Sequence, residues 1–266
     1  MRALLALLAL LLTVPASVES QRRETGFLFR TLTLGDSTYR YQVYVPPGYT
    51  PRRRWPVILF LHGSGERGAD GLVQTQVGLG AAIRRGVERW PAIVVMPQAR
   101  PEQSWTREME RVALAALART ERELRTDPAR IYLTGLSMGG YGTWSIAARH
   151  PGRFAALLVV CGGIHPPARV PFPRDETGFW ELPDPYAAYA RALGRTPVWI
   201  FHGDTDPVVP VDESRRMHAA LQAAGADVRY TELPGVGHNA WDPAYTDPAV
   251  PAWLLAQRLP SPPRRP

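Results

Sequence analysis

The residues best suited to chemistry lie in a short motif, Gly-Leu-Ser-Met-Gly at residues 135–139. A serine between two such glycines is typical of a nucleophile elbow, in which the serine occupies a sharp turn between a strand and a helix. A strand-like run at 131–133 precedes the motif, and a helix-like stretch at 141–149 follows it. Side chains at the flanking positions would collide with the neighbouring elements, which explains the glycines. The motif predicts that Ser137 is a nucleophile.

A serine hydroxyl becomes reactive only when a base takes its proton. The chain has six histidines: His62, His150, His165, His202, His218 and His238. After a nucleophile elbow the acid follows first and the histidine second, which excludes His62. His150 would lie about 20 Å away at the far end of the next helix, and His202 ends a core strand. His238 lies in a glycine-rich loop beyond the strand-like run 228–233, where a catalytic histidine belongs. We predict His238 as the base.

The acid is expected between the serine and this histidine, in a loop after a core strand. The strand-like stretch 196–201 is followed by a loop that contains two aspartates, Asp204 and Asp206. Asp206 is predicted to be the acid, since it sits further into the loop and can reach back to His238. Asp204 is interpreted as a turn former whose side chain accepts backbone N–H groups. The acid would fix the tautomer of the imidazole and stabilise the imidazolium.

Backbone N–H groups near the serine are expected to bind a developing oxyanion. One should come from Met138, directly after the nucleophile, and the other from the glycine-rich loop 62–68. Ser64 is the predicted second donor and Gly65 the alternative, while His62 is expected to hold this loop rather than touch a substrate. Three tryptophans, which are equally well explained as packing residues, are candidates for lining a substrate pocket: Trp105, Trp180 and Trp241.

The elements that must position these residues alternate between strands and helices. Residues 27–34 and 39–45 alternate apolar and polar side chains and predict an antiparallel hairpin. Short apolar runs then suit parallel strands buried on both faces; they occupy 57–61, 93–96, 131–133, 156–160 and 198–201. Helical patterns lie at 107–125, 214–224 and 248–258. The pattern predicts an α/β fold with a mostly parallel central sheet and helices on both faces.

The chain is expected to form one domain over residues 21–260. Residues 163–196, rich in proline and aromatic side chains, interrupt the alternation and predict an irregular lid, a binding loop or an insertion packed on the outside. Residues 1–20 have a basic start, a ten-residue apolar run and small residues, which is the pattern of a signal peptide; an uncleaved anchor is the alternative. The proline-rich tail 261–266 is expected to be disordered. These features predict a secreted or periplasmic protein without stable membrane insertion once the signal peptide is cleaved.

Composition excludes several other kinds of site. All 31 basic residues are arginine, so a P-loop lysine, a Schiff-base lysine and a Ser-Lys dyad are excluded. A single cysteine, Cys161, excludes an internal disulfide and a cysteine-rich zinc site. The net charge of +7 comes from scattered arginines without interleaved aromatic residues, which indicates a solvated surface rather than a nucleic-acid interface.

These motifs resemble those of α/β-hydrolases over about residues 25–260. The resemblance is closer to a secreted bacterial group described as predicted peptidases or phospholipase/carboxylesterase-like proteins, similar to feruloyl esterases and polyhydroxyalkanoate depolymerases. It rests on His62-Gly63, on residues 135–140, on residues 202–210 and on Gly237-His238. The resemblance implies an α/β-hydrolase fold and a Ser-Asp-His esterase without metal or organic cofactor. It also implies a small-molecule or polymer-linked ester as substrate; a monomer or weak homo-oligomer is expected.

The leading hypothesis is therefore a secreted serine hydrolase that cleaves carboxylic esters through an acyl-enzyme. A serine peptidase with the same three residues is the first alternative. A binding protein that uses a hydrolase fold without catalysis is the second.

Overall fold

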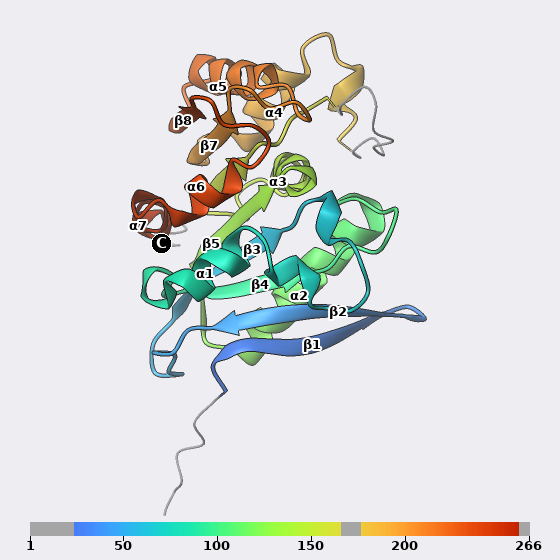
Figure 1. The fold of residues 1–266 in the computed structure, drawn as a ribbon, viewed down its shortest axis with the longest axis vertical. Helices are drawn as coiled ribbons and strands as arrows, with labels where there is room; N and C mark the ends of the chain where they lie inside the picture. Colours follow the sequence, from blue (N-terminus) through green and yellow to red (C-terminus); the bar gives the residue numbers. More distant parts are fainter. Residues whose placement is uncertain (1–23, 166–176, 261–266) are drawn as a thin grey trace, which may run out of the picture.

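A computed structural model of the protein describes residues 24–165 and 177–260. The predicted signal peptide, the tail 261–266 and part of the segment 163–196 therefore lie outside the described residues. Within the described part, one sheet of eight strands has the order β1-β2-β4-β3-β5-β6-β7-β8 (Figure 1). The strands are β1 (Gly26–Leu34), β2 (Ser37–Val45), β3 (Trp55–Leu61), β4 (Ile93–Pro97), β5 (Thr126–Leu136), β6 (Ala156–Val160), β7 (Val198–Gly203) and β8 (Val228–Leu233).

Helices connect most of these strands. The α-helices are α1 (Leu79–Arg85), α2 (Arg107–Glu123), α3 (Met138–Arg149), α4 (Pro185–Leu193), α5 (Asp212–Ala223), α6 (Trp241–Thr246) and α7 (Ala249–Ala256). Short 3₁₀ helices are η1 (Ser64–Glu66), η2 (Val73–Thr75), η3 (Val87–Arg89) and η4 (Phe179–Glu181). As Figure 1 shows, β1 and β2 lie at the lower end of the sheet and β7 and β8 at the upper end.

The sheet is mostly parallel, as predicted. Strands β1 and β2 form the expected antiparallel hairpin, whose tight turn pairs Leu34 with Ser37. Strand β2 also runs antiparallel to β4, and every later pairing from β4 through β3 and β5 to β8 is parallel. The antiparallel hairpin therefore extends one edge of a parallel α/β sheet.

Helices cover both faces of the sheet, which confirms the second part of the fold prediction. Alternate residues of β3 enter different hydrophobic clusters: Val57 and Leu59 belong to one, Ile58 and Phe60 to the other. Helices α2, α3, α4 and α5 complete the first cluster, whereas α1, α6 and α7 complete the second. Because a strand directs successive side chains to opposite faces, burial on both sides explains the continuous apolar runs.

The segment 163–196, whose proline content predicts irregular structure, contains a regular helix. Helix α4 begins with Pro185 in its first turn, and the side chain of Asp184 accepts the N–H of Ala187 at 3.0 Å. Tyr186 and Tyr189 are buried in the first hydrophobic cluster. The expectation of an irregular segment is thus wrong for α4. An aspartate followed by proline is a helix-start signal that could have revealed it.

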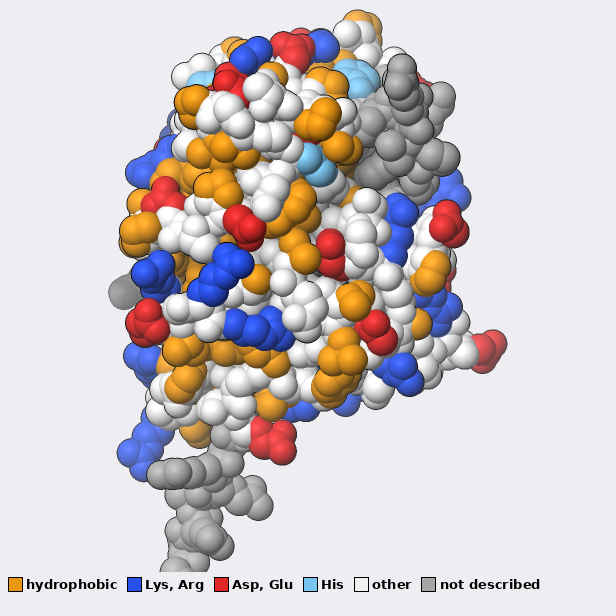
Figure 2. Space-filling view, in the orientation of Figure 1, with side chains coloured by type: hydrophobic (Ala, Val, Ile, Leu, Met, Phe, Trp, Pro, Cys, Tyr) orange, Lys and Arg blue, Asp and Glu red, His pale blue; other side chains and the backbone are white. Residues whose placement is uncertain are grey.

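The described surface agrees with a dispersed charge pattern. On the face shown in Figure 2, arginine side chains are interspersed with aspartate and glutamate. No helix within the described residues is both long and apolar enough to cross a membrane.

Strands β3 and β5 are neighbours at the point where the order of the strands reverses. Leu61 at the end of β3 pairs with Gly135 near the end of β5, so the loops that leave these strands start side by side. In α/β sheets, ligands bind outside the carboxyl ends of strands at such a point. The helix after β5 also approaches β3 closely: a Cβ added to Gly139 would lie 2.0 Å from the carbonyl oxygen of Leu61.

This close approach makes Gly139 a sensitive position for stability. We expect Gly139→Ala to lower the free energy of unfolding by about 3 kcal/mol, because backbone atoms on both sides must shift, and the melting temperature by roughly 10 °C. The matched control is Gly65→Ala, where an added Cβ meets no atom within 4 Å. Thermal unfolding followed by circular dichroism measures both, and equal melting temperatures would contradict the proposed close contact.

Candidate active site

Ser137 occupies a strained turn between β5 and α3. Its φ of 51° and ψ of −117° lie in a region that residues with a side chain rarely adopt. Such a conformation costs about 1–3 kcal/mol and persists only where the surroundings hold it. Here the N–H of Ser137 donates to Val160 O at 2.9 Å, and every residue of α3 from 138 to 148 is buried. The serine itself stays partly exposed. The buried helix α3 thus holds a hydroxyl group that solvent can reach.

The structure brings the three predicted side chains together. His238 Nε2 lies 2.9 Å from Ser137 Oγ, and His238 Nδ1 lies 2.7 Å from Asp206 Oδ2. An ionised carboxylate can only accept hydrogen bonds, so Nδ1 carries a proton and donates it to Asp206. In the neutral ring Nε2 is then unprotonated and accepts the hydroxyl proton of Ser137. This is the orientation that a general base needs.

The carboxylate of Asp206 is buried and fully engaged. Oδ1 accepts the backbone N–H groups of Val208 at 2.8 Å and Val209 at 3.0 Å, while Oδ2 lies 2.7 Å from His238 Nδ1 and 3.2 Å from His202 Nε2. Burial alone would raise the pKa of this carboxyl, but the hydrogen bonds from the two histidines and the two backbone groups lower it well below its usual range. Asp206 is therefore ionised at neutral pH.

The other aspartate of this loop does not reach the imidazole. Asp204 Oδ1 accepts the N–H of Gly235 at 2.7 Å. Because Gly235 belongs to the loop that carries His238, this bond ties the loop after β7 to the loop after β8. Asp204 thus accepts a backbone N–H, as the sequence pattern predicts, but across two loops rather than within one turn.

The two predicted oxyanion donors lie at the beginnings of helices. Ser64 is the first residue of η1 and is exposed, and Met138 is the first residue of α3. The N–H of a first helical residue has no acceptor within its own helix. The pairing of β3 with β5 places both helix starts at the same edge of the sheet.

His62 holds the loop that contains Ser64, as the sequence predicts. The ring is buried; Nε2 accepts the N–H of Ala99 at 2.9 Å, and Nδ1 lies 2.6 Å from Gly63 O. Since Nε2 accepts, Nδ1 carries the proton, and the ring is neutral. Burial lowers the pKa of His62 to about 4, against the opposing effect of the bond to Gly63.

Of the three tryptophans, Trp105 does not line an accessible pocket. It is 1% exposed, its Nε1 donates to the carbonyl of His62 at 2.9 Å, and its ring packs edge-on against the His62 ring. Its assignment as a substrate-binding residue is therefore wrong. Trp105 instead packs against His62 and supports the loop 62–68.

The other two tryptophans differ in what the structure describes. Trp180 lies in η4, and its side chain falls outside the described part. Trp241 begins α6, is partly buried, and stands edge-on to the His238 ring with centroids 5.4 Å apart. Trp241 is thus the one predicted tryptophan that the described side chains place against His238.

Sequence reasoning missed two residues that support this arrangement, His202 and Trp105. The position of His202 at the end of a core strand does not suit a general base, but its burial there is a signal of a supporting role. A polar ring at a position that is 0% exposed requires partners, and the acid loop that follows supplies them. The position of Trp105 in a loop gave no comparable signal.

A thiol also lies beside the histidine and the aspartate. Ligand atoms of Cys161, Asp206 and His238 lie within 4.8 Å of one another, a spacing that could hold a metal ion. The donors fit this poorly, because both oxygens of Asp206 already accept hydrogen bonds and burial raises the pKa of the Cys161 thiol, which keeps it protonated. The arrangement therefore favours proton transfer over metal binding.

One carboxylate fixes the start of the segment that follows β6. Glu213 on α5 accepts the N–H groups of Ile164 at 2.7 Å and His165 at 3.0 Å, and also the hydroxyl of Tyr186 at 2.9 Å. Tyr141, four residues after Ser137, donates to the carbonyl of His165 at 3.0 Å. Helices α3, α4 and α5 thus all hold residues 164 and 165 in place.

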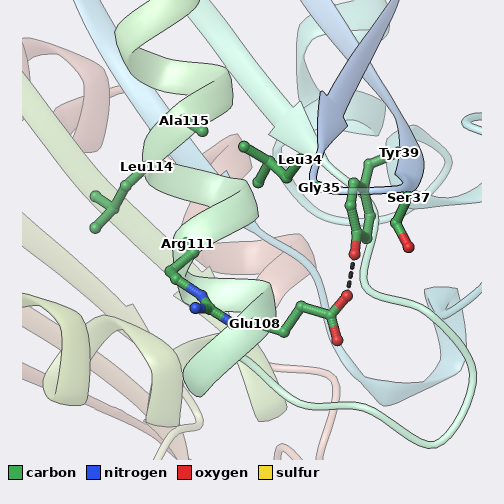
Figure 3. Close-up of a pocket in the computed structure, with 8 residues that line it drawn as sticks. All are labelled: Leu34, Gly35, Ser37, Tyr39, Glu108, Arg111, Leu114 and Ala115. Atoms are coloured by element: carbon green, nitrogen blue, oxygen red, sulfur yellow. Dashed lines mark hydrogen bonds between the residues drawn. The ribbon is translucent and has the colours of Figure 1, made fainter.

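A separate cavity of about 590 Å³ lies between the hairpin turn and α2 (Figure 3). It is lined by Leu34, Gly35, Ser37, Tyr39, Glu108, Arg111, Leu114 and Ala115. Figure 3 shows the hydroxyl of Tyr39 pointing at the carboxylate of Glu108, to which it donates a hydrogen bond. None of these described residues belongs to the site around Ser137.

Comparison with known proteins reveals clear relatives. The model of a family described as "Putative esterase" matches residues 33–243. Putative esterase NocK from Nocardia uniformis subsp. tsuyamanensis is 28% identical over 208 residues, which are 74% of this chain and 54% of that protein. The chain thus spans about half the length of this curated relative.

Solved structures share the fold. The crystal structure of a thermostable esterase has a TM-score of 0.74 and 29% identity, covering 87% of this chain and 63% of that one. A CE1 ferulic acid esterase from Anaeromyces mucronatus, solved in complex with ferulic acid, has a TM-score of 0.62 and 15% identity, covering 89% and 93%. These likenesses identify the α/β-hydrolase fold predicted from the sequence.

The buried neutral His62 predicts a pH-dependent contribution to stability. The pKa is 6.5 in the unfolded chain and about 4 in the folded one, so only the unfolded chain takes up a proton between these values. The contribution is fully present above pH 6.5 and lost as the pH falls to 4, in total about 3 kcal/mol. This contribution is measured by urea unfolding of the wild type and of the His62→Gln variant, whose side chain does not titrate, at pH 7 and at pH 4. We expect the difference in stability between the two to shrink by this amount from pH 7 to pH 4; a constant difference would contradict a buried neutral ring.

Proposed function

The chain belongs to the Putative esterase family, and from this premise we propose that it is a serine hydrolase that cleaves carboxylic esters through Ser137, His238 and Asp206. One observation carries the proposal: the unbroken series of contacts from Asp206 Oδ2 to His238 Nδ1, at 2.7 Å, and from His238 Nε2 to Ser137 Oγ, at 2.9 Å. Three side chains from distant parts of the chain meet in the order that proton transfer from a serine requires.

The proposed reaction proceeds in two steps. Ser137 Oγ attacks the ester carbonyl while His238 Nε2 takes the hydroxyl proton, and the imidazolium then returns that proton to the leaving alcohol. A water molecule, deprotonated by the same nitrogen, then attacks the acyl carbonyl; the bond to Ser137 Oγ breaks, and the imidazolium returns the proton to this oxygen. Asp206 keeps the imidazole in the required tautomer and stabilises its charged form, because its carboxylate is ionised and buried beside Nδ1.

Two backbone donors would stabilise the tetrahedral oxyanion. The N–H of Met138 is at the start of α3, where the positive end of the helix dipole adds to it. The N–H of Ser64 is the proposed second donor, from the loop that His62 and Trp105 support. Such donors act on the transition state because they are already oriented before the reaction begins.

The proposed substrate is a small-molecule or polymer-linked carboxylic ester. The partly buried Trp241 beside His238 offers an aromatic surface at the site, and the fold is shared with an enzyme solved with ferulic acid. Both support including aromatic acyl groups among the candidates. We further propose that residues 1–20 direct secretion; cell fractionation and the N-terminal sequence of the mature protein test this.

Two variants and one substrate panel test the assignment of the reactive residues. The wild type is expected to hydrolyse nitrophenyl and feruloyl esters but not matched anilides. Ser137→Ala should lower kcat on the order of 10⁶-fold and Asp206→Asn on the order of 10⁴-fold, because the amide favours the wrong tautomer.

The matched control for this test is Asp204→Asn. Its amide oxygen can still accept the N–H of Gly235, so we expect kcat to fall less than about tenfold. If the Ser137→Ala variant hydrolyses esters at the wild-type rate, Ser137 is not the nucleophile. If the wild type turns over anilides faster than esters, the protein is a peptidase instead.

The oxyanion hole can be tested by deleting one backbone N–H. Ser64→Pro removes the donor at the first position of η1, where proline fits a helix, and Gly63 before it already has the extended conformation (φ −77°, ψ −179°) that a following proline requires. We expect kcat to fall about 10²- to 10³-fold. Ser64→Ala keeps the N–H and should stay within about threefold of the wild type. Steady-state kinetics compare the two, and equal rates would assign the second donor elsewhere.

A further inference from the structure

A second histidine contacts the carboxylate oxygen that His238 contacts. His202 lies near the end of β7 and is 0% exposed. Its Nε2 lies 3.2 Å from Asp206 Oδ2, and its Nδ1 lies 2.6 Å from the hydroxyl of Ser214 on α5. The contacts of the site therefore continue beyond Asp206 into the core, as a series Ser137–His238–Asp206–His202–Ser214.

The surroundings of His202 determine where its proton is. Besides the carboxylate of Asp206, Nε2 faces the carbonyl oxygen of Val209 at 3.0 Å. Both neighbours carry lone pairs and no proton, so an unprotonated Nε2 would be repelled by each. His202 Nε2 must therefore carry a proton, which it shares between these two oxygens. Nδ1 meets the Ser214 hydroxyl, which can adapt as donor or acceptor.

We propose that His202 is a positioning residue: its Nε2–H holds Asp206 Oδ2 at the place where His238 Nδ1 meets it. The inference rests on the roles proposed above for Asp206 and His238. The backbone N–H groups of Val208 and Val209 fix only Oδ1, which leaves the carboxylate free to swing about that oxygen. A donor on Oδ2 removes this freedom. Since His202 has no exposed surface, it acts through Asp206 and never touches a substrate.

The same proton also moderates the charge that His238 experiences. An N–H on Oδ2 withdraws negative charge from the oxygen that stabilises the imidazolium. Removing it leaves more negative charge on Oδ2, which stabilises the imidazolium that forms during turnover. Among the described residues, further titratable groups that interact with this pair include Cys161 and Tyr141, which interact with Asp206, and Glu232, which interacts with His202. All three stay unchanged in the variants below, so a shift in the pH profile reports on His202.

Two amide variants form a matched pair. The amide nitrogen of His202→Gln can occupy the position of Nε2 and donate to Asp206, whereas that of His202→Asn ends one carbon short, near Ser214. We expect His202→Gln to keep kcat within about fivefold of the wild type and His202→Asn to lose about 10- to 100-fold, with KM within about twofold for both. The acidic limb of the profile of kcat/KM against pH should move to higher pH in His202→Asn only.

NMR of protein labelled with ¹⁵N-histidine tests the geometry without turnover. In the wild type, His202 Nε2 should be protonated, and the His238 Nδ1 proton should give a low-field signal that persists in His202→Gln and shifts or broadens in His202→Asn. An unprotonated Nε2 overturns the proposal, even if neither variant folds. Equal kinetics and equal Nδ1 signals in the two variants also overturn it. A wild type that passes the NMR test but hydrolyses no ester contradicts the proposed function instead.

Discussion

Helix α3 can start where it does only because Gly139 packs against the carbonyl of Leu61 with no side chain between them. That contact brings the N-terminus of the helix to the end of β3 and fixes the turn at Ser137, whose backbone is strained. The buried length of α3 compensates for the strain, since relaxing the turn would withdraw the helix from the core. The close approach of Gly139 to Leu61 thus helps to set the positions of the proposed nucleophile and of both proposed oxyanion donors.

A buried negative charge is the second constraint. An ionised carboxylate removed from water is costly unless hydrogen bonds replace the water, and Asp206 has four donors on its two oxygens. Two come from its own loop, and two come from histidines on different elements. The loops after β7 and β8 and the end of β7 are therefore coupled through a single group, which explains why a polar ring such as His202 is retained in the core.

The sequence predicted the parts of the fold and site that depend on local chemistry. Apolar runs identified the buried strands. The glycines around Ser137 identified the elbow, because a turn this tight excludes side chains at the flanking positions. The positions of Asp206 and His238 in loops that follow strands were enough to predict that the two side chains pair. Roles that depend on contacts between distant elements were not visible: Trp105 supports the carbonyl of His62 from 43 residues away. Helix α4 was hidden because proline was interpreted as a breaker rather than as a helix start.

The contact between Ser137 and His238 joins elements from the two faces of the sheet. Ser137 precedes a helix that packs on one face of the sheet, while His238 precedes α6, which packs on the other. The 2.9 Å contact between Ser137 and His238 therefore connects the helices on one face of the sheet to those on the other, and its length depends on how the two helical layers are aligned. If one helical layer moved relative to the other by a fraction of this 2.9 Å distance, the hydrogen bond between Ser137 and His238 would break while the packing within each layer stayed intact. The geometry of the proposed proton transfer is therefore a property of how the two layers pack together, not of either layer alone.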